Sequence, residues 1–338
     1  MRKIRSRAPL RIGLAGGGTD LDVYCNRFTG NVLNTTISLY TYCFMDENNS
    51  DKIIFKSQDL NQKFNFMIGD NIEFDGKMDL YKAIYLHLLN KYNFEPLGFT
   101  LNTFSDTACG SGLGGSSTLV VSIIKAYSLF FDLNLNKEEI ASIAFKVERE
   151  DVGIIGGAQD QYAAAYGGFN FMYFNKKNVE VEPLNLAKDI IEELQSSTVL
   201  FYTGIQRNAS QIEKEKKSLI NKEQSLLAMH RIKKNAIQMA DHLKNSEILH
   251  FATILNESWK NKKMVSKAVS NNKIDNIYNL ALNHGAYGGK VSGAGGGGHM
   301  FFIIDPIKKN SLINALDKED GEVVNFKFEN EGAYSWIV

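Results

Sequence analysis

A glycine-rich segment of the chain has the residue types and spacing of an anion-binding loop. Residues 109–118 read Cys-Gly-Ser-Gly-Leu-Gly-Gly-Ser-Ser-Thr. They follow a segment predicted to be extended (98–104) and precede one with helical spacing (119–131). Glycines let backbone N–H groups turn toward a ligand, and the beginning of a helix adds partial positive charge. The serines place hydroxyl groups where a phosphate or its metal ion would lie.

The loop differs from a P-loop in one position. Gly110-x4-Gly115 is followed by Ser116-Ser117, where a P-loop has a lysine and then a serine or threonine. A helix N-terminus contributes only about 0.3–1 kcal/mol per anionic contact, which is too little for a highly charged nucleotide. We therefore expect Mg²⁺ on a hydroxyl and a carboxylate, together with a cation from elsewhere in the chain, to balance the charge of ATP.

The bulk composition is that of a soluble globular protein without a nucleic-acid or membrane partner. The 338 residues include 38 Lys+Arg and 38 Asp+Glu, with 44% hydrophobic residues. The sequence shows no run of membrane-span length and no signal-peptide pattern at its start, so we predict a cytoplasmic protein. Cys25, Cys43 and Cys109 are odd in number and far apart, which indicates reduced thiols rather than a disulfide or zinc site.

Glycines are concentrated in three places. Of the 28 glycines, four lie within 13–18, four within 110–115 and eight within 285–298. Turn chemistry is the usual reason for loop glycines, but such dense clusters favour close approach of backbone to a ligand.

Hydrophobic spacing predicts strands and helices that alternate irregularly. In the first half we predict strands or extended segments at 4–14, 32–45, 53–57, 63–68, 98–104, 167–174 and 179–184. Helices are predicted at 79–92, 119–131 and 159–166, and another runs from the capping-box pair Asn136 and Glu139 to about residue 150.

The character of the chain changes around 185–197. We predict a strand at 198–203, three mainly helical stretches up to about Gly285, and then a strand (299–304), a helix (307–316) and two closing strands. The lysines within 214–217 and 260–263 are predicted to form solvated helix faces. These elements indicate an α+β fold with two lobes, which we divide into domains 1–185 and 186–338.

Three motifs in order resemble those of the GHMP kinases. They are Ala-Pro-Leu-Arg-Ile-Gly-Leu-Ala-Gly-Gly-Gly-Thr-Asp at 8–20, the glycine loop at 109–118, and Lys-Val-Ser-Gly-Ala-Gly-Gly-Gly-Gly-His-Met at 290–300. The resemblance implies a ribosomal-protein-S5-like N-terminal domain, an α+β C-terminal domain, and ATP with Mg²⁺ as cofactors. It also implies an ATP-binding loop made of Gly110, Ser111, Gly112, Leu113, Gly114, Gly115, Ser116 and Ser117.

Two segments are similar to those of one branch of that family, the bacterial D-glycero-D-manno-heptose 7-phosphate kinases. They are the first motif and Gly-Gly-Ala-Gln-Asp-Gln-Tyr at 156–162. This implies phosphate transfer from ATP to the anomeric hydroxyl of a sugar phosphate, giving the 1,7-bisphosphate for GDP-heptose and surface polysaccharide. Gly17-Gly18 replaces the Glu-His of galactokinase, which argues against galactose as acceptor. A sister kinase acting on fucose or an unphosphorylated heptose stays open, as does the oligomeric state.

The resemblance also gives roles to single residues. Ser116, or its neighbour Ser117, matches the serine that binds Mg²⁺, and Glu148 matches the second magnesium ligand; Glu150 and Asp151 are alternatives to it. Asp160 corresponds to the aspartate that either orients or also deprotonates the accepting hydroxyl. Arg11 matches the basic position of the first motif and is the candidate for the cation that the loop lacks.

The remaining expected contacts are with the acceptor. We expect Thr19 and Asp20 to bond sugar hydroxyls, and Arg207 to bind the 7-phosphate because arginine pairs with phosphate bidentately. The acceptor-binding residues are then Arg11, Gly17, Gly18, Thr19, Asp20, Asp160, Arg207 and Gly295. Cys109, His284 and His299 lie near motifs, and we assign them structural roles.

Two other classes of function are compatible with parts of the sequence. Gly110-x-Gly112-x-x-Gly115 formally matches a dinucleotide-binding fingerprint, but Asp132 directly follows a predicted helix rather than ending a strand. A non-catalytic sensor of the same fold would be expected to have lost one of Arg11, Ser116, Glu148 or Asp160. All four are present, which favours an enzyme.

Overall fold

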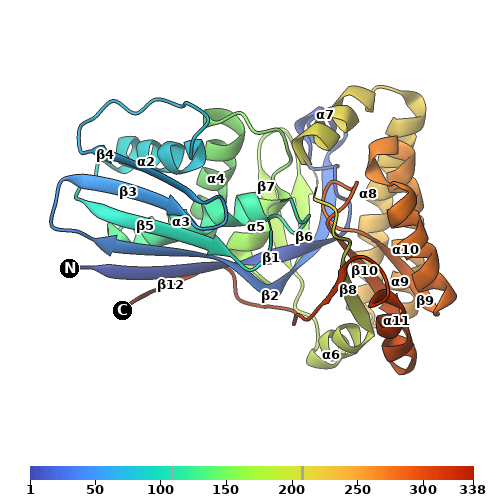
Figure 1. Ribbon diagram of the computed structural model, residues 1–338. Coiled ribbons are helices and arrows are strands. Elements are labelled where there is room, and N and C mark those ends of the chain that lie inside the picture. Colours follow the sequence, from blue (N-terminus) through green and yellow to red (C-terminus); the bar gives the residue numbers. More distant parts are fainter. Residues whose placement is uncertain (109, 207–208) are drawn as a thin grey trace.

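The computed structural model describes residues 1–108, 110–206 and 209–338, and it consists of two sheets with helices packed against them (Figure 1). The first sheet has eight strands, of which six follow the order β12-β1-β2-β5-β3-β4, and β6 and β7 extend it from β2. The second has four strands in the order β11-β8-β10-β9. The pairs are antiparallel except for β3 with β5.

The first sheet is built around two long strands. Its strands are β1 (Lys3–Ala15), β2 (Gly30–Glu47), β3 (Lys52–Ser57), β4 (Gln62–Met67), β5 (Phe99–Ser105), β6 (Phe169–Phe174), β7 (Val179–Pro183) and β12 (Tyr334–Ile337). One half of β2 pairs with β5 and the other half with β6, so this strand holds the whole sheet together. A short helix, α1 (Asp22–Phe28), connects β1 to β2.

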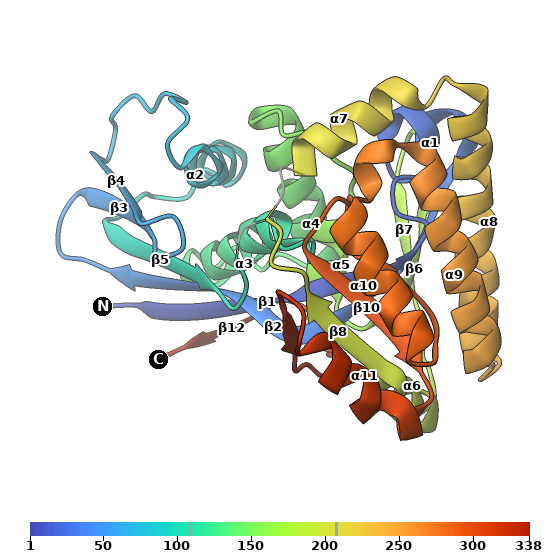
Figure 2. The ribbon, with the colours of Figure 1, turned by 45° about the vertical axis from the view of Figure 1, so that its right-hand side comes forward.

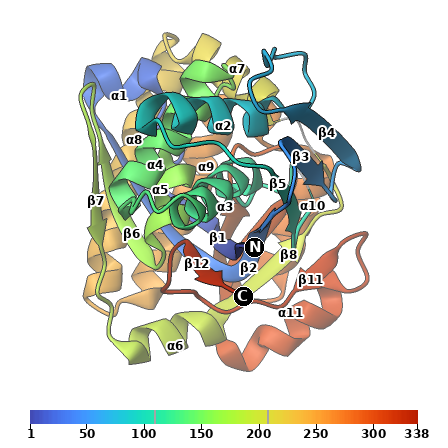
Figure 3. The ribbon, with the colours of Figure 1, turned by 90° about the vertical axis from the view of Figure 1, so that its left-hand side faces the viewer.

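One face of the first sheet is covered by helices (Figure 3). These are α2 (Asp79–Tyr92), α3 (Gly115–Phe130), α4 (Lys137–Lys146), the π-helical turn η1 (Val147–Asp151) and α5 (Gln159–Tyr166). Apolar residues of α3 such as Val121, Ile124 and Tyr127 are completely buried in this layer. Asn136 and Glu139 form the predicted capping box at the start of α4, because each side chain bonds the backbone N–H of the other.

The second lobe places a helical layer on the smaller sheet (Figure 2). Its strands are β8 (Thr198–Tyr202), β9 (Ala286–Val291), β10 (His299–Ile304) and β11 (Glu322–Val324). Its helices are α6 (Lys188–Ser197), α7 (Ala209–Leu219), α8 (Glu223–Lys244), α9 (Ile248–Val265), η2 (Lys267–Val269), α10 (Asn272–Asn283), η3 (Pro306–Lys308) and α11 (Lys309–Leu316). Leu10 and Ile12 of β1 share one apolar core with Phe251 of α9 and Phe301 of β10, so the two lobes are packed together.

The predicted α+β class with two lobes is confirmed, and most predicted strands and helices are present, but some details of the elements were wrong. The glycine segment 285–298 contains strand β9, in which a Cβ on Gly289 would lie 2.3 Å from the ring of Phe302. Four α-helices rather than three occupy the described residues between β8 and β9. Helix α3 begins at Gly115, inside the predicted loop.

The predicted solvated lysine faces are wrong at one position in each run. Lys216 is only 3% exposed and pairs with Glu213, with the Nζ–Oε1 distance at 2.9 Å. Lys262 is 4% exposed and donates to the carbonyl of Gly293. Each of these helices buries a face on which the lysine must find carbonyl or carboxylate partners.

Among the residues that the structure describes, no helix combines the length and apolar character that crossing a bilayer requires.

Candidate active site

The functional candidates converge on a cavity of about 350 Å³. From the first lobe it is lined by the end of β1 and the following glycine turn, the loop that leads into α3, the π-turn, and the segment 154–160. The second lobe contributes Ser210 and Glu213 of α7, Lys262 of α9, and Lys290. The cavity therefore has walls from segments far apart in sequence.

The glycine loop is held from two sides by backbone contacts. The N–H of Arg11 donates to the carbonyl of Leu113 at 3.0 Å, and the N–H of His299 donates to the carbonyl of Ser111 at 2.9 Å. Gly114 has φ +80°, and a Cβ there would lie 3.3 Å from Oδ2 of Asp160. The loop thus needs glycine at this position, and its shape is fixed by β1 and β10 before any ligand binds.

The ring of His299, from the second lobe, also holds the glycine loop. Its Nδ1 lies 2.8 Å from the carbonyl oxygen of Ser111, and the side chain is buried. Burial lowers the pKa of His299 to about 4, although the carbonyl acts against this shift. The imidazole is therefore neutral near pH 7 and donates its Nδ1 hydrogen to the loop.

Arg11 and Asp160 form a two-pronged ion pair on the cavity wall. Nε of Arg11 donates to Oδ1 of Asp160 at 2.8 Å, and the Nη2–Oδ2 distance is 2.7 Å. The third guanidinium nitrogen, Nη1, donates to the carbonyl of Gly112 at 2.6 Å. One arginine thereby joins the aspartate on the first turn of α5 to the glycine loop, in the bidentate geometry of a strong arginine–carboxylate pair.

Ser116 and Glu148 meet at one wall of the cavity. The Ser116 hydroxyl, in the first turn of α3, donates to Oε1 of Glu148 at 3.1 Å. Glu148 is 1% exposed, accepts a hydrogen bond from the Gln161 amide, and has Nη1 of Arg149 at 3.8 Å. The π-turn widens the helix at this point, a distortion common at functional sites, and it carries Glu148.

The geometry distinguishes Glu148 from Glu150 and Asp151, the two alternatives for the expected acidic magnesium ligand. Glu150 is exposed, and Oδ2 of Asp151 lies 3.0 Å from Nδ1 of His87. Of the three acids only Glu148 lines the cavity. Ser117 also lines it, but Ser116 has the hydrogen bond to Glu148.

Asp20 is a buried carboxylate held by the turn after β1. It accepts from the backbone N–H of Gly18 at 3.0 Å and from the Gln159 amide at 3.1 Å. Burial raises the pKa of Asp20, and the nearby carboxylates of Asp160 and Glu213 raise it further. Gly157 must lack a side chain here, because a Cβ would lie 1.8 Å from Oδ2 of Asp20.

Two buried lysines of the second lobe border the cavity. Lys290 donates to the carbonyls of Gly13 and Leu14 at 2.9 and 3.1 Å. Burial, and then the positive charges of Arg11 and Lys216, lower its pKa to about 7. Lys262 reaches the same region from α9. Lys290 opens the third motif, so a signal for it existed, whereas Lys262 lies in a run that resembles a solvated helix face.

Further predicted residues are placed as follows. Gly17, Gly18 and Asp20 line the cavity. Thr19 does not: it is completely buried, and its hydroxyl bonds the carbonyls of Gly16 and Asn31 at 2.8 and 2.9 Å. A structural role in the turn is therefore favoured for Thr19.

Two other predicted residues have packing roles in the structure. The Leu113 side chain lies in the apolar core, while its carbonyl holds Arg11. Gly295 packs on Val269, where a Cβ would meet backbone at 2.8 Å. Arg207 and Cys109 lie outside the described residues.

Sequence analysis did not single out several polar residues that border the cavity. Gln159 stands in the segment 156–162 that carried the resemblance, so it could have been found. Glu213 has one buried carboxylate oxygen, Oε2, without a hydrogen-bond partner. Arg149 donates to the carbonyls of Ile154 and Gly157 and so fixes the segment before α5.

The dinucleotide-fold alternative does not agree with this topology. The glycine loop connects β5 to α3, and β5 pairs with β2 antiparallel. Asp132 follows α3 directly and pairs with Arg2 at 2.9 Å. It therefore cannot serve as the acid that ends a second parallel strand in a Rossmann unit.

A segment in each half of the chain matches a known family domain. Residues 79–168 match the GHMP kinases N terminal domain, and residues 239–322 match the GHMP kinases C terminal domain. The chain belongs to the GHMP kinase family, whose members are ATP-dependent phosphotransferases.

The chain is also similar to individual members of the family over nearly its full length. A D-glycero-alpha-D-manno-heptose 7-phosphate kinase of Campylobacter jejuni subsp. jejuni serotype O:2 is 50% identical over 339 residues, covering 100% of both chains. A crystal structure of a C. jejuni protein assigned as a sugar kinase has a TM-score of 0.84 at 48% identity, covering 100% of this chain and 99% of that one. A D-glycero-D-manno-heptose 1-phosphate kinase from Bacteroides thetaiotaomicron has a TM-score of 0.84 at 37% identity, covering 98% of both chains.

Proposed function

We propose that this protein transfers the γ-phosphate of ATP to the anomeric hydroxyl of D-glycero-D-manno-heptose 7-phosphate. The observation that carries the proposal is the Arg11–Asp160 pair, which lines one cavity together with the glycine loop and is hydrogen-bonded to that loop through Arg11. Full-length identity of 50% to a heptose 7-phosphate kinase supports this acceptor. The 1,7-bisphosphate would serve the formation of GDP-activated heptose for surface polysaccharide.

Mg²⁺ fits the residues on the nucleotide side. Ser116 offers a hydroxyl and Glu148 a buried carboxylate, and magnesium typically takes one or two such protein oxygens together with phosphate oxygens and waters. When bound, the ion would offset charge on the β- and γ-phosphates. Ser116 and Glu148 would hold it, while the backbone of residues 110–115 would cradle the phosphates.

Asp160 is the residue that we assign to bind the acceptor hydroxyl. Arg11 fixes both carboxylate oxygens, so Asp160 can accept a hydrogen bond from the anomeric hydroxyl in a single orientation. Nη1 of the same guanidinium donates to the glycine loop, where the transferred phosphate would lie. Asp20, Gln159 and the backbone of Gly17 and Gly18 are placed to bond further sugar hydroxyls.

The 7-phosphate requires a cation on the acceptor side. Within the described part of the chain, Lys262 and Lys290 line the cavity there, and Arg207 remains the residue predicted from sequence. The three can be separated by comparing phosphorylated and unphosphorylated heptose as acceptors. Substitution of a residue that binds the 7-phosphate should raise the KM for the phosphorylated sugar and leave the KM for the unphosphorylated sugar unchanged.

The acceptor can be tested directly. ADP release should be measured with D-glycero-D-manno-heptose 7-phosphate, unphosphorylated heptose, L-fucose and D-galactose, followed by ³¹P NMR of the product. We expect turnover with the 7-phosphate and a new anomeric phosphate ester. Preferred turnover of fucose or free heptose would assign the chain to a sister sugar kinase. Absence of ADP release with every acceptor would favour a sensor.

Glu148→Gln tests the magnesium site. The substitution keeps the side-chain shape but removes the charge, so we expect turnover to fall by about 10²-fold or more and the Mg²⁺ concentration for half-maximal rate to rise. Glu150→Gln is the matched control, because Glu150 is exposed in the same turn and does not line the cavity. Equal effects of both substitutions would contradict the assignment.

A further inference from the structure

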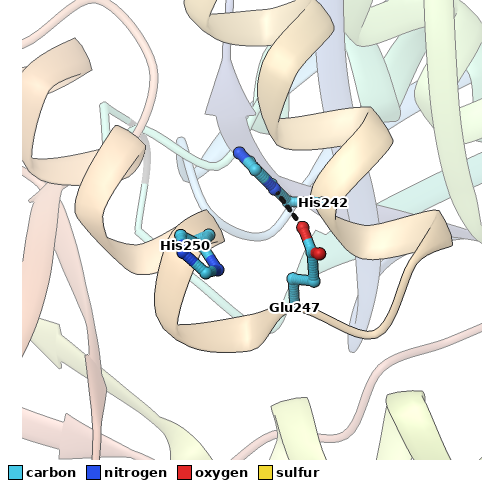
Figure 4. A group of neighbouring side chains, drawn as sticks. All are labelled: His242, Glu247 and His250. Atoms are coloured by element: carbon cyan, nitrogen blue, oxygen red, sulfur yellow. Dashed lines mark hydrogen bonds and ion pairs between the residues drawn. The ribbon is translucent and has the colours of Figure 1, made fainter.

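A second cluster of metal-binding residue types lies in the turn between α8 and α9, outside the cavity. His242 stands near the end of α8, Glu247 immediately precedes α9, and His250 lies in the first turn of α9 (Figure 4). None of the three lines the catalytic cavity. Helix α8 has 22 residues, and at 1.5 Å per residue this turn lies about 30 Å from the end of α8 that joins α7.

The three side chains gather around one point. Nδ1 of His242 lies 2.6 Å from Oε2 of Glu247, and the two imidazole rings are nearly parallel, with 5.3 Å between centroids and 19° between planes. One ligand atom from each residue can be chosen so that all lie within 4.8 Å of one another. In Figure 4 the His242 ring points from α8 toward the Glu247 carboxylate, and His250 approaches from the next helical turn.

The turn that carries these residues is held by its own backbone and core. The N–H of Glu247 donates to the carbonyl of His242 at 2.8 Å, and the N–H of Ser246 donates to the carbonyl of Leu243 at 3.1 Å. Leu243 and Phe251 are completely buried in the core shared by the two lobes. The backbone positions of the cluster are thus fixed without any ion, which lowers the ordering cost of binding one.

We propose that His242, Glu247 and His250 form a binding site for a divalent transition-metal ion of the Zn²⁺ type. Two imidazoles with one carboxylate are a donor set that suits zinc and not magnesium or calcium, which prefer oxygen ligands alone. Bonds of about 2.0–2.1 Å in tetrahedral geometry separate ligand atoms by about 3.3 Å, so rotation of exposed side chains would close the set. Water would take the fourth position.

The ion would join the end of α8 to the start of α9. These helices carry buried residues of the inter-lobe core, including Met239 and Ala240 on α8 and Leu255 on α9. An ion bound to the folded turn and not to the unfolded chain stabilises the fold in proportion to the logarithm of its concentration over Kd. The site is therefore structural, and it is separate from the magnesium proposed beside Glu148.

The test is calorimetric titration of the metal-free, full-length protein, without a histidine tag, with ZnCl₂ in the presence of excess Mg²⁺. We expect one Zn²⁺ per chain with micromolar affinity, and a thermal unfolding midpoint that rises with added Zn²⁺. His242→Ala, His250→Ala and Glu247→Gln should each weaken binding at least about tenfold. His284→Ala is the matched control, since His284 ends another helix and bonds Ser311.

Each outcome decides the proposal. Loss of the binding event in the His242→Ala/His250→Ala double variant, with retention in the control and unchanged folding by circular dichroism, supports it. A Co²⁺ complex with the visible absorption of a tetrahedral site would support it further. Absence of Zn²⁺ binding by the wild type, or binding by the double variant equal to the wild type, would overturn it.

Discussion

The guanidinium of Arg11 contacts both halves of the proposed reaction centre. Two of its nitrogens engage the oxygens of Asp160, and the third reaches the carbonyl of Gly112 in the loop assigned to ATP. Because Arg11 is only 3% exposed, water competes little for these hydrogen bonds. Removal of the Arg11 side chain should therefore affect positioning of the acceptor and of the nucleotide together.

Asp160→Asn should separate orientation from nucleotide binding. The amide keeps the size of the side chain but cannot accept a proton, so we expect turnover to fall about 10²–10⁴-fold while the Kd for ATP is kept. Steady-state kinetics and a nucleotide titration measure the two quantities. A loss below about tenfold would mean that positioning by Arg11 and the metal ion dominates, and Arg11→Lys, which removes the two-pronged contact, should then be the more damaging substitution.

His299 should make the fold sensitive to acid. Its pKa is about 4 in the folded protein and usually 6.5, so between these values the unfolded chain binds the proton and the folded chain does not. The free energy of unfolding of the wild type should fall relative to that of His299→Gln by up to about 3 kcal/mol as pH falls from 6.5 to 4. Urea unfolding at several pH values measures this difference. Parallel pH profiles would contradict the buried neutral imidazole.

At the scale of elements, the glycines in and beside the cavity act in two ways. Gly298 stands where β10 approaches the glycine loop, with φ +80°, and a Cβ there would lie 2.3 Å from the carbonyl oxygen of Ser111. Gly115 begins α3, and a Cβ on it would meet no protein atom within 4 Å. The first glycine permits packing between segments, and the second leaves space for a ligand.

The two alanine substitutions should therefore differ. Gly298→Ala should lower the free energy of unfolding by about 2–4 kcal/mol, because backbone must move and a positive φ must be kept. Gly115→Ala should leave stability unchanged or slightly raised by its helix propensity, and should raise KM for ATP. Thermal unfolding and ATP kinetics on both variants test this. A KM effect confined to Gly298→Ala would assign the open space beside Gly115 to something other than the nucleotide.

Sequence periodicity was sufficient for elements whose apolar faces are regular. The bounds of α2 and α5 agree with the predicted ranges, and Asn136 with Glu139 gave the start of α4. Strand β9 was missed because its glycines, such as Gly288 and Gly289, are there for close packing on neighbouring segments. A glycine chosen for lack of volume looks in the sequence like a glycine chosen for a turn.

The site was predictable for the residues that the resemblance to the GHMP kinases marks directly. The structure brings Arg11, Ser116, Glu148 and Asp160 to one cavity, as the motifs suggested. Lys262 was missed because the sequence around it matches a solvated face, and only tertiary packing turns that lysine inward. The hydrogen bonds of the Thr19 hydroxyl to backbone carbonyls could not be inferred either, because they too depend on the tertiary structure.

At the scale of the whole molecule, the two lobes are not independent. The predicted division at 185/186 remains a prediction, but the segment 186–338 includes β12, which pairs with β1 in the first sheet. Phe326 and Phe328 pack against the core shared by both lobes, and Phe328 also bridges to Ile37. The last part of the chain thus ties the second lobe back to the first.

Truncation after Val324 should test this tie. It removes β12 and two half-buried phenylalanines, so we expect the free energy of unfolding to fall by at least about 3 kcal/mol. Truncation after Trp336 is the matched control: it removes only Ile337 and Val338, which are 71% and 70% exposed, and should cost about 1 kcal/mol or less. A similar loss in both, measured by denaturant unfolding, would show that the return of the chain contributes little.

The pairing of Ile4 with Ile337 has a practical consequence, because it brings the two chain termini together at one edge of the first sheet (Figure 1). Arg11 lies seven residues further along the same strand, about 23 Å away at the rise of an extended chain. A short linker could join the two ends of this chain, so that new ends are opened in a surface loop such as the one containing Gly69 and Gly76. A circular permutant of this kind, or a carrier fused at either end, should leave the reaction centre accessible.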